Sequence, residues 1–410
     1  MRRLALLLLL STGCSDDPCE GVQGTCIGIS EGASATDVQT ALIEISPGGT
    51  VAFGAGRFAL RTDLSLDVDD VTIQGAGMDD TVLTFDGQTA GAQGLLVTAN
   101  NFVIHDIAIE DTRGDALKVL GGDGVTIERM RVEWTAGPNE TNGSYGLYPV
   151  QCKNVLIADS VVRGASDAGI YVGQSDNIIV RDNTAEDNVA GIEIENSTNA
   201  DVFGNTATKN TGGILVFNLP GLEVENGAIT RVYDNDINAN NTENFAPSGN
   251  IVGLVPTGTG IAILAAHQVE IFGNRIGDHK SINLGVISYV PTGIEVTDPS
   301  YDQYPTAIAI HDNTLTGTSD MPTGQLGGLL ISAIGELHPD PPFIVPDIAW
   351  DGVVDPARTY GPEDKICIQN NGDANFINLG WPLGDQETPA SEDMTPHDCT
   401  LAPLPEVHLP

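Results

Sequence analysis

The sequence predicts an all-β protein folded as a parallel β-helix, closed by a short helix at its N-terminal end and by an irregular cover at its C-terminal end. Three observations predict this class. Short apolar strands that open with glycine recur with a period near 22 residues, asparagines recur at fixed offsets from them, and no helical pattern lies between them. Such a period is typical of coils that stack on one another.

Composition sets the first limits on function. The 410 residues are 41% hydrophobic and 18% charged, which suffices to bury a large core in one long domain or two smaller ones. The 17 Lys and Arg residues against 56 Asp and Glu residues give a net charge of −39. Binding to nucleic acid or to anionic lipid depends on clustered basic residues, so we expect neither partner.

The first 14 residues predict an export signal rather than part of the fold. Arg2 and Arg3 precede a short apolar run, and small residues precede Cys14. The segment resembles a bacterial lipoprotein signal, which implies that Cys14 is lipidated and that the lipid is the chain's only contact with a membrane. We therefore expect the protein in the bacterial cell envelope, at the outer membrane, in the periplasm or on the cell surface. An ordinary cleaved secretory signal is the alternative.

The elements then follow in order along the chain. Residues 15–35 are expected to form a linker, and residues 36–335 the β-helix with its cap. Thr36 and Asp37 precede apolar residues at helical spacing, Val38, Leu42 and Ile45, which predicts a short capping helix. Apolar stretches at 51–53 and 71–74 start the stack.

Seven strands that open with glycine define the repeat. From Gly146 the first three steps are 23, 22 and 22 residues. The strands start at Gly94, Gly146, Gly169, Gly191, Gly213, Gly260 and Gly328, and the asparagines that follow other strands are Asn183, Asn205, Asn235, Asn274 and Asn313, with Asn188, Asn210 and Asn240 five residues after the first three. Gly and Asn tolerate left-handed corners, and stacked Asn side chains can form hydrogen-bonded ladders. The Leu-x-x-Leu-x-Leu frame of leucine-rich repeats is missing.

The repeat fades near residue 336, where the composition changes. Twelve of the 23 prolines fall between Pro339 and Pro410. We expect residues 336–410 to cover the open end of the coil, because exposed terminal coils would invite edge-to-edge association. Cys367 with Cys399, and Cys19 with Cys26, are the natural local disulfide pairs in an oxidising compartment, which leaves Cys152 as a free thiol.

The run from Val71-Thr72-Ile73-Gln74-Gly75-Ala76-Gly77 through the repeats to about Tyr289 resembles the right-handed parallel β-helix proteins of the pectate-lyase-like group. It is most similar to the bacterial exported β-helix repeat proteins. The resemblance implies a right-handed coil. It does not select one function, because this fold hosts lyases, epimerases, hydrolases, adhesins and copper-delivery proteins.

Strand alternation predicts one functional face. Two residues after each opening glycine, the side chain should point away from the core. The outward residues of successive coils are Lys118, Tyr148, Tyr171 and Glu193, and an amide series follows at Gln151, Gln174 and Asn196. Coils about 4.8 Å apart match the repeat of an extended glycan, so we expect these residues to bind a polysaccharide. The alternative is an ordinary β-surface with amides that only fill a ladder.

Two insertions favour the same face. Residues 134–145 and 241–259 each lengthen a coil just before a glycine-opened strand. Both should rise at one corner, four coils or about 19 Å apart, and wall a groove that begins at Trp134 and Tyr145. A Trp134 packed against the coil is the alternative.

The segment Tyr145-Gly146-Leu147-Tyr148-Pro149-Val150 is similar to a strand start of mannuronan C5-epimerases, which reads Tyr-Gly-hydrophobic-Asp-Pro-His. Only the catalytic Tyr is matched, by Tyr145; Tyr148 and Val150 replace the Asp and the His. A lyase would use Tyr145 and Tyr148 as base and acid, with Lys118 neutralising the substrate carboxylate. A hydrolase would need two carboxylates, and Glu193 with Glu140 or Glu195 is the nearby set.

The function expected from the sequence is binding of a uronate-containing polysaccharide, with lyase- or epimerase-type processing left open. A noncatalytic envelope or adhesion protein is the alternative, followed by a metal-delivery accessory protein. We expect no required cofactor and no dedicated metal site. Calcium stays open, since carboxylates such as Asp182, Asp187 and Asp234 offer hard ligands but no calcium-loop motif is present.

Overall fold

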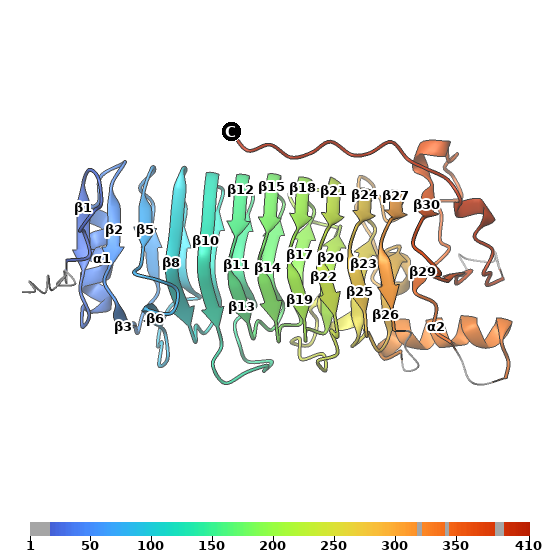
Figure 1. Cartoon of the computed structure of the whole chain (residues 1–410), viewed down its shortest axis with the longest axis horizontal. Helices are drawn as coiled ribbons and strands as arrows, with labels where there is room; N and C mark the ends of the chain where they lie inside the picture. Colours follow the sequence, from blue (N-terminus) through green and yellow to red (C-terminus); the bar gives the residue numbers. More distant parts are fainter. Residues whose placement is uncertain (1–16, 318–321, 341–343, 382–388) are drawn as a thin grey trace, which may run out of the picture.

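The computed structural model describes residues 17–317, 322–340, 344–381 and 389–410. The chain winds into an elongated parallel β-helix whose coils follow one another along the long axis (Figure 1). Within the described residues, one face of the coil is an 11-stranded parallel sheet. Its strands are β4 (Leu64–Leu66), β7 (Gln93–Val97), β9 (Asp115–Leu120), β11 (Tyr145–Val150), β14 (Ala168–Gly173), β17 (Ala190–Glu195), β20 (Gly212–Phe217), β23 (Thr259–Leu264), β26 (Ile282–Ile287), β29 (Ile348–Trp350) and β31 (Phe376–Asn378).

Two further series of parallel strands complete the coils. The first is β1 (Cys26–Ile29), β2 (Thr50–Phe53), β5 (Thr72–Gln74), β8 (Phe102–Glu110), β10 (Asp123–Glu133), β12 (Lys153–Ala158), β15 (Asp176–Arg181), β18 (Thr198–Phe203), β21 (Ala228–Tyr233), β24 (His267–Phe272), β27 (Thr306–His311) and β30 (Ile366–Gln369). The second is β3 (Gly56–Ala59), β6 (Thr81–Thr84), β13 (Val161–Arg163), β16 (Thr184–Glu186), β19 (Thr206–Thr208), β22 (Asp236–Asn238), β25 (Arg275–Gly277) and β28 (Thr314–Thr316). The long strands β8 and β10 belong to both series.

The core is the inside of the coil. Inward side chains of neighbouring strands pair in register, as Ile170 does with Ile192 and Ile192 with Ile214, and all three are fully buried. Apolar residues from every face join them in one continuous cluster. The all-β parallel β-helix predicted from the repeat is therefore confirmed.

A short helix, α1 (Ala35–Glu44), covers the N-terminal end. Its buried residues include Val38 and Leu42, which were predicted to face the core. The N-cap is Ser34 rather than Thr36, because the Ser34 hydroxyl accepts a hydrogen bond from the backbone of Asp37, whose side chain accepts in return from the Ser34 backbone. Strand β1 pairs with β2, so the sheet begins inside the segment that the sequence analysis assigns to a linker.

Buried asparagines form the two predicted ladders. In the first, each side-chain amide donates to the side-chain oxygen of the asparagine on the next coil at 2.9–3.0 Å, from Asn183 through Asn205, Asn235, Asn274 and Asn313 to Asn371. The second runs from Asn188 through Asn210 to Asn240, whose amide lies 3.1 Å from His279 Nε2. Each ladder satisfies backbone groups at a corner that is closed to water.

One expected strand is wrong. Gly328 and the three apolar residues after it lie in a helix, α2 (Gly324–Leu337), which buries Gly327, Leu330, Ala333 and Ile334. Buried residues three and four positions apart are typical of a helix. The local Gly-Leu-Leu-Ile sequence resembles the glycine-opened strands, which is why a strand was predicted here. The sheets then resume in β29, β30 and β31, so pairing continues past residue 335, where the sequence analysis starts the cover.

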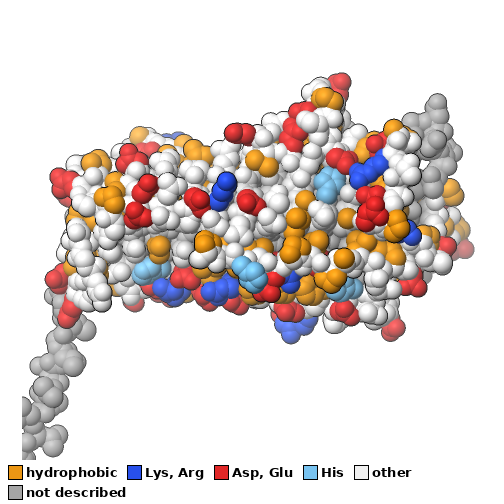
Figure 2. All heavy atoms as spheres, turned by 90° about the horizontal axis from the view of Figure 1, so that it is seen from above, with side chains coloured by type: hydrophobic (Ala, Val, Ile, Leu, Met, Phe, Trp, Pro, Cys, Tyr) orange, Lys and Arg blue, Asp and Glu red, His pale blue; other side chains and the backbone are white. Residues whose placement is uncertain are grey.

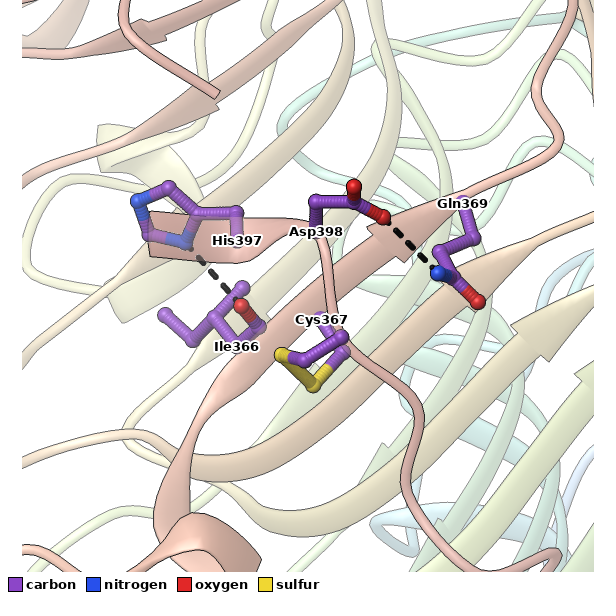
Figure 3. Close-up of a disulfide and its surroundings, with 6 residues drawn as sticks. Ile366, Cys367, Gln369, His397 and Asp398 are labelled. Atoms are coloured by element: carbon purple, nitrogen blue, oxygen red, sulfur yellow. Dashed lines mark hydrogen bonds between the residues drawn. A yellow bond between two sulfur atoms is a disulfide. The ribbon is translucent and has the colours of Figure 1, made fainter. Parts of the chain in front are cut away.

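The C-terminal segment is fastened to the coil. Both expected disulfides are present, Cys19–Cys26 and Cys367–Cys399. Beside the second, His397 lies 3.0 Å from the Ile366 carbonyl, and Gln369 donates to Asp398 (Figure 3). From there the last residues of the chain run back along the β-helix, and the C-terminus lies near β12 (Figure 1). Cys152 is free and buried.

Short 3-10 helices lie in the connecting segments: η1 (Ile251–Leu254), η2 (Val290–Thr292), η3 (Pro362–Asp364) and η4 (Thr395–His397). Acidic side chains are spread over the face seen in Figure 2, with the Lys and Arg side chains close to them. Arg131, for example, contacts Glu110 and Glu133 at 2.8 Å. Within the described ranges no helix is long and apolar enough to cross a membrane.

Candidate functional site: a roofed carboxylate pocket

The outward column predicted from the repeat exists. In the 11-stranded sheet, Lys118 pairs with Tyr148, and Tyr171 pairs with Glu193 on the next strand. The rings of Tyr145, Tyr148 and Tyr171 form one cluster, with centroids 4.5–5.0 Å apart. Register therefore brings these side chains together on a single face.

That face is covered rather than open. Two segments of the chain, 241–259 and 288–305, fold over it and are called the roof below. Val252 and Val255 of the first, with Tyr289 and Tyr301 of the second, pack with Tyr171 in a second buried apolar cluster outside the coil. The hydroxyl of Tyr301 fastens the roof by donating to the carbonyl of Asn218 at 2.6 Å. Tyr171 is consequently 4% exposed and Glu193 is 1% exposed.

The roof and the sheet line a pocket of about 870 Å³. The sheet contributes Tyr145, Glu193 and Glu195, and Asp167 comes from the residue directly before β14. The rest of the lining comes from Ser144, Leu219, Asn244, Ala246, Pro247, Ser248, Gly249, Asn250, Ile251, Gly253, Leu254, Tyr289, Thr292 and Ile294. Both predicted insertions thus reach the pocket, although the first supplies only its last two residues.

Three carboxyl groups meet in this pocket. Glu195 accepts a hydrogen bond of 2.6 Å from the Tyr171 hydroxyl. Asp167 accepts from the side chain of Asn250 at 2.7 Å and from the Tyr145 hydroxyl at 3.4 Å. The bond from Asn250 joins the roof directly to an acid on the sheet. Glu193 has no hydrogen-bond partner at either carboxylate oxygen in the described part of the chain.

Burial decides the protonation of these acids. It raises the pKa of Asp167 to about 7, although the hydrogen bonds from Asn250 and Tyr145 favour the charged form and lower this pKa. Burial likewise raises the pKa of Glu195 to about 7, against the bond from Tyr171. Burial, and then the charge of Glu195, raise the pKa of Glu193 well above its ordinary value. At neutral pH the pocket therefore holds both carboxylic acid and carboxylate.

The tyrosines are poor bases here. Burial raises the pKa of Tyr148 to about 12, with Asp115 and Glu195 adding to the effect. Burial and the charge of Asp167 raise the pKa of Tyr145 still further. Lys118 lies 4.6 Å from the ring centroid of Tyr148, over its face, and does not line the pocket. The lyase assignment of Tyr145, Tyr148 and Lys118 requires a lowered phenol pKa, and the environment acts in the opposite direction.

Other residues expected to bind substrate have partners within the chain. Trp134 is 5% exposed, belongs to the central core and donates its ring N–H to the carbonyl of Thr112. Gln151 donates to Glu223, and Gln174 accepts from the backbone of Glu223. Asn196 donates to the carbonyls of Leu219 and Val224. These amides hold the segment after β20 against the coil, and Trp134 belongs to the core and does not line the pocket.

Two residues of the pocket were not predicted from the sequence, Asp167 and Asn250. Asp167 directly precedes β14, a position that the outward pattern of the strand does not include. Asn250 lies in the second insertion, and a repeat gives no information on how an insertion folds back. An acid two residues before the opening Gly169 was the available signal, and Asp115, the first residue of β9, shares it in part.

The sequence leaves calcium binding open and predicts no dedicated metal site. Within the described residues no group of three or more His, Cys, Asp or Glu residues is arranged to hold a metal ion. Cys14, the predicted lipidation site, lies outside the described residues.

Gly173 makes room for the Tyr171 ring. A Cβ at Gly173 would lie 2.4 Å from ring atoms and the hydroxyl of Tyr171. We expect Gly173→Ala to displace the ring and break its bond to Glu195, and so to lower the unfolding free energy by about 1–3 kcal/mol. Thermal unfolding of this variant, with Gly285→Ala as the control, measures the effect. Gly285 lies in the same sheet, and a Cβ there would meet nothing closer than 3.7 Å. Equal loss in both variants would contradict the account.

Glu193 should destabilise the fold as pH rises. Its pKa in the folded protein lies above the ordinary 4.5, so the folded state keeps a proton that the unfolded state loses. Stability is therefore full below about pH 4.5 and falls as pH rises toward the folded pKa. Leu215 occupies the same register position on the next strand. We expect Glu193→Leu to raise stability by about 1–3 kcal/mol at pH 8 and by less at pH 5. A pH-independent difference in thermal melts would refute the explanation.

Comparison with known proteins identifies the fold. A family model described as a right-handed beta helix region matches residues 65–229. Among solved structures, DFA-IIIase from Arthrobacter chlorophenolicus A6 is 11% identical, with a TM-score of 0.50 over 84% of this chain and 94% of that one. The chain therefore has the right-handed β-helix fold that the sequence resemblance implied.

Two further structures are similar at lower TM-scores. The A-module of a mannuronan C-5 epimerase from Azotobacter vinelandii is 23% identical, with a TM-score of 0.47 over 70% of this chain and 84% of that one. An alginate lyase from Paenibacillus sp. str. FPU-7 is 14% identical, with a TM-score of 0.45 over 72% of this chain and 96% of that one. A search of curated proteins finds no match.

Proposed function

We propose that this protein binds a polysaccharide in the roofed pocket and hydrolyses a glycosidic bond there with Asp167 and Glu195. The observation that carries the proposal is that one sugar-sized pocket buries both carboxyl groups and raises the pKa of each to about 7. Glycoside hydrolysis uses two such groups, one as acid and one as carboxylate, at the same pH. The tyrosine rings at the pocket supply the aromatic surface on which sugars pack.

The proposed reaction balances with water alone. The protonated carboxyl donates its proton to the glycosidic oxygen, and the bond from that oxygen to the anomeric carbon breaks. A water molecule adds to the anomeric carbon, and its proton passes to the other carboxylate. Exchange of protons with solvent restores both groups.

A panel of polysaccharides incubated with the full chain tests this function. We expect new reducing ends from at least one polymer, without the ultraviolet absorbance of an unsaturated uronate that β-elimination would produce. Binding without cleavage would reduce the function to recognition, the role expected of an adhesion protein. Absorbance without hydrolysis would restore the lyase hypothesis. No binding and no cleavage with any polymer would overturn the proposal.

Uronate specificity is not part of the proposal. A uronate needs a cation or a neutral donor at its carboxylate. No Lys, Arg or His is among the described residues that line the pocket, and Asp167, Glu193 and Glu195 would repel an anion. The structures of similar fold include a mannuronan epimerase and an alginate lyase, but their similarity to this chain is too low to indicate its substrate.

Export and lipid anchoring through Cys14 belong to the proposal as well. Two disulfides support an oxidising compartment. Metabolic labelling of bacteria with an alkyne fatty acid should mark the wild-type chain and leave Cys14→Ser unlabelled. Equal labelling of both would place the lipid elsewhere, and an unlabelled wild type would favour an ordinary secretory signal.

A further inference from the structure

Glu193 is the least satisfied polar group in the pocket. Its side chain is 1% exposed and lines the pocket, yet neither carboxylate oxygen has a hydrogen-bond partner among the described residues. Its neighbours in the outward column are Tyr171 on one side and Leu215 on the other. A buried carboxylate without a partner costs several kcal/mol unless it is protonated or meets a cation.

The described chain offers this carboxyl no cation. Lys118 is the basic residue of the same column, but it lies three strands away from Glu193, which is about 14 Å at the spacing of β-strands. Its ammonium group is over the ring of Tyr148. The other charged residues of the pocket, Asp167 and Glu195, are acids and add to the negative potential.

Two aromatic side chains line the same space, Tyr145 from the sheet and Tyr289 from the roof. The rings of Tyr148 and Tyr171 pack against Tyr145 and do not line the pocket. Carboxylates combined with aromatic faces form the environment that binds ammonium groups, through ion pairing and cation–π attraction. The net charge of −39 would also draw cationic ligands toward the protein.

We infer that the pocket selects a glycan carrying a free amino group, and that the protonated amine of the sugar pairs with Glu193. This inference rests on the proposed function, because it assumes that the pocket binds a glycan. It names the substrate class as an amino sugar without an acetyl group, such as a 2-amino-2-deoxyhexose unit in a polymer. An N-acetylated unit has no charge to pair with Glu193. A uronate carries a negative charge, which the acids of the pocket would repel.

Three oligosaccharides with the same β-1,4-linked backbone test the inference. They are oligomers of glucosamine, N-acetylglucosamine and glucose, which differ only in the group at carbon 2. We expect calorimetric titration of the full chain, at neutral pH and low salt, to give at least about tenfold tighter binding of the glucosamine oligomer. Glu193→Gln should remove most of that preference.

Glu140→Gln is the matched control. Glu140 is an exposed acid on the first insertion, and its replacement changes the net charge of the protein by the same amount. We expect this variant to keep the preference for the amine. If both variants lost the preference for the amine equally, long-range attraction rather than contact with Glu193 would be its cause. Thermal melts establish that both variants are folded.

The outcomes separate this inference from the proposed function. Equal affinity for the three oligomers, or an unchanged preference in Glu193→Gln, overturns the role of Glu193 while glycan binding stands. If only neutral or anionic polymers of the wider panel bind tightly, the role of Glu193 is likewise overturned while glycan binding stands. Failure of every glycan to bind overturns the proposed function and this inference together.

Discussion

Replacement of Glu195 by Gln is expected to lower the turnover of a cleaved polysaccharide by about 10²- to 10⁴-fold, the usual range for loss of general acid or base catalysis. The amide can accept the hydrogen bond that the Tyr171 hydroxyl makes to Glu195, so the pocket should keep its shape. It cannot donate or accept a proton at neutral pH. We therefore expect the dissociation constant for the substrate to change little while turnover falls.

Asp167→Asn should have an effect of the same order, since the side chain of Asn250 donates to the oxygen that would be retained. The wild-type rate should peak near pH 7, because the two groups titrate together with pKa values of about 7. Below that pH the base is lost, and above it the acid is lost. Wild-type turnover in both variants would remove these residues from catalysis.

Replacement of Asn205 by Ala is expected to lower the unfolding free energy by about 4 kcal/mol. The Asn205 side chain donates to the carbonyl of Val180 and to the side chain of Asn235, and accepts from the backbone and side chain of Asn183. Alanine would leave several of these buried groups unsatisfied, at about 1–3 kcal/mol each. Chemical denaturation measures the loss.

Asn139→Ala is the control for this effect. Asn139 is exposed and bonds only within its own turn, so its loss should cost less than about 1 kcal/mol. Because coils of a repeat protein contact mainly their neighbours, Asn205→Ala should also expose nearby amides to hydrogen exchange first. Similar stability of the two variants would show that the ladder contributes little.

The repeat made the coil predictable from sequence. Stacking is set by backbone pairing, so residues 22 or 23 positions apart fall into register wherever a coil has no insertion, as Tyr148, Tyr171 and Glu193 do. The same logic placed the asparagine ladders and the outward column. It failed at Gly328, where a glycine before three apolar residues imitates a strand inside a helix.

The pocket was less predictable because insertions build most of it. Register shows that Glu193 points away from the core, but not that residues 241–259 and 288–305 bury it under a second apolar cluster. That burial reverses the chemistry expected of the face. It raises the pKa of Tyr148 instead of lowering it, and it turns Glu195 into a group that holds a proton near neutral pH. Such effects depend on how loops fold back, and no periodic pattern encodes this.

The most direct test is a crystal structure of the Glu195→Gln protein with the oligosaccharide that binds it most tightly. We predict sugar density in the roofed pocket, with a glycosidic oxygen within hydrogen-bond distance of Asp167 or of residue 195. A sugar bound on another face of the coil, with the pocket unchanged, would contradict the assignment of this pocket as the active site.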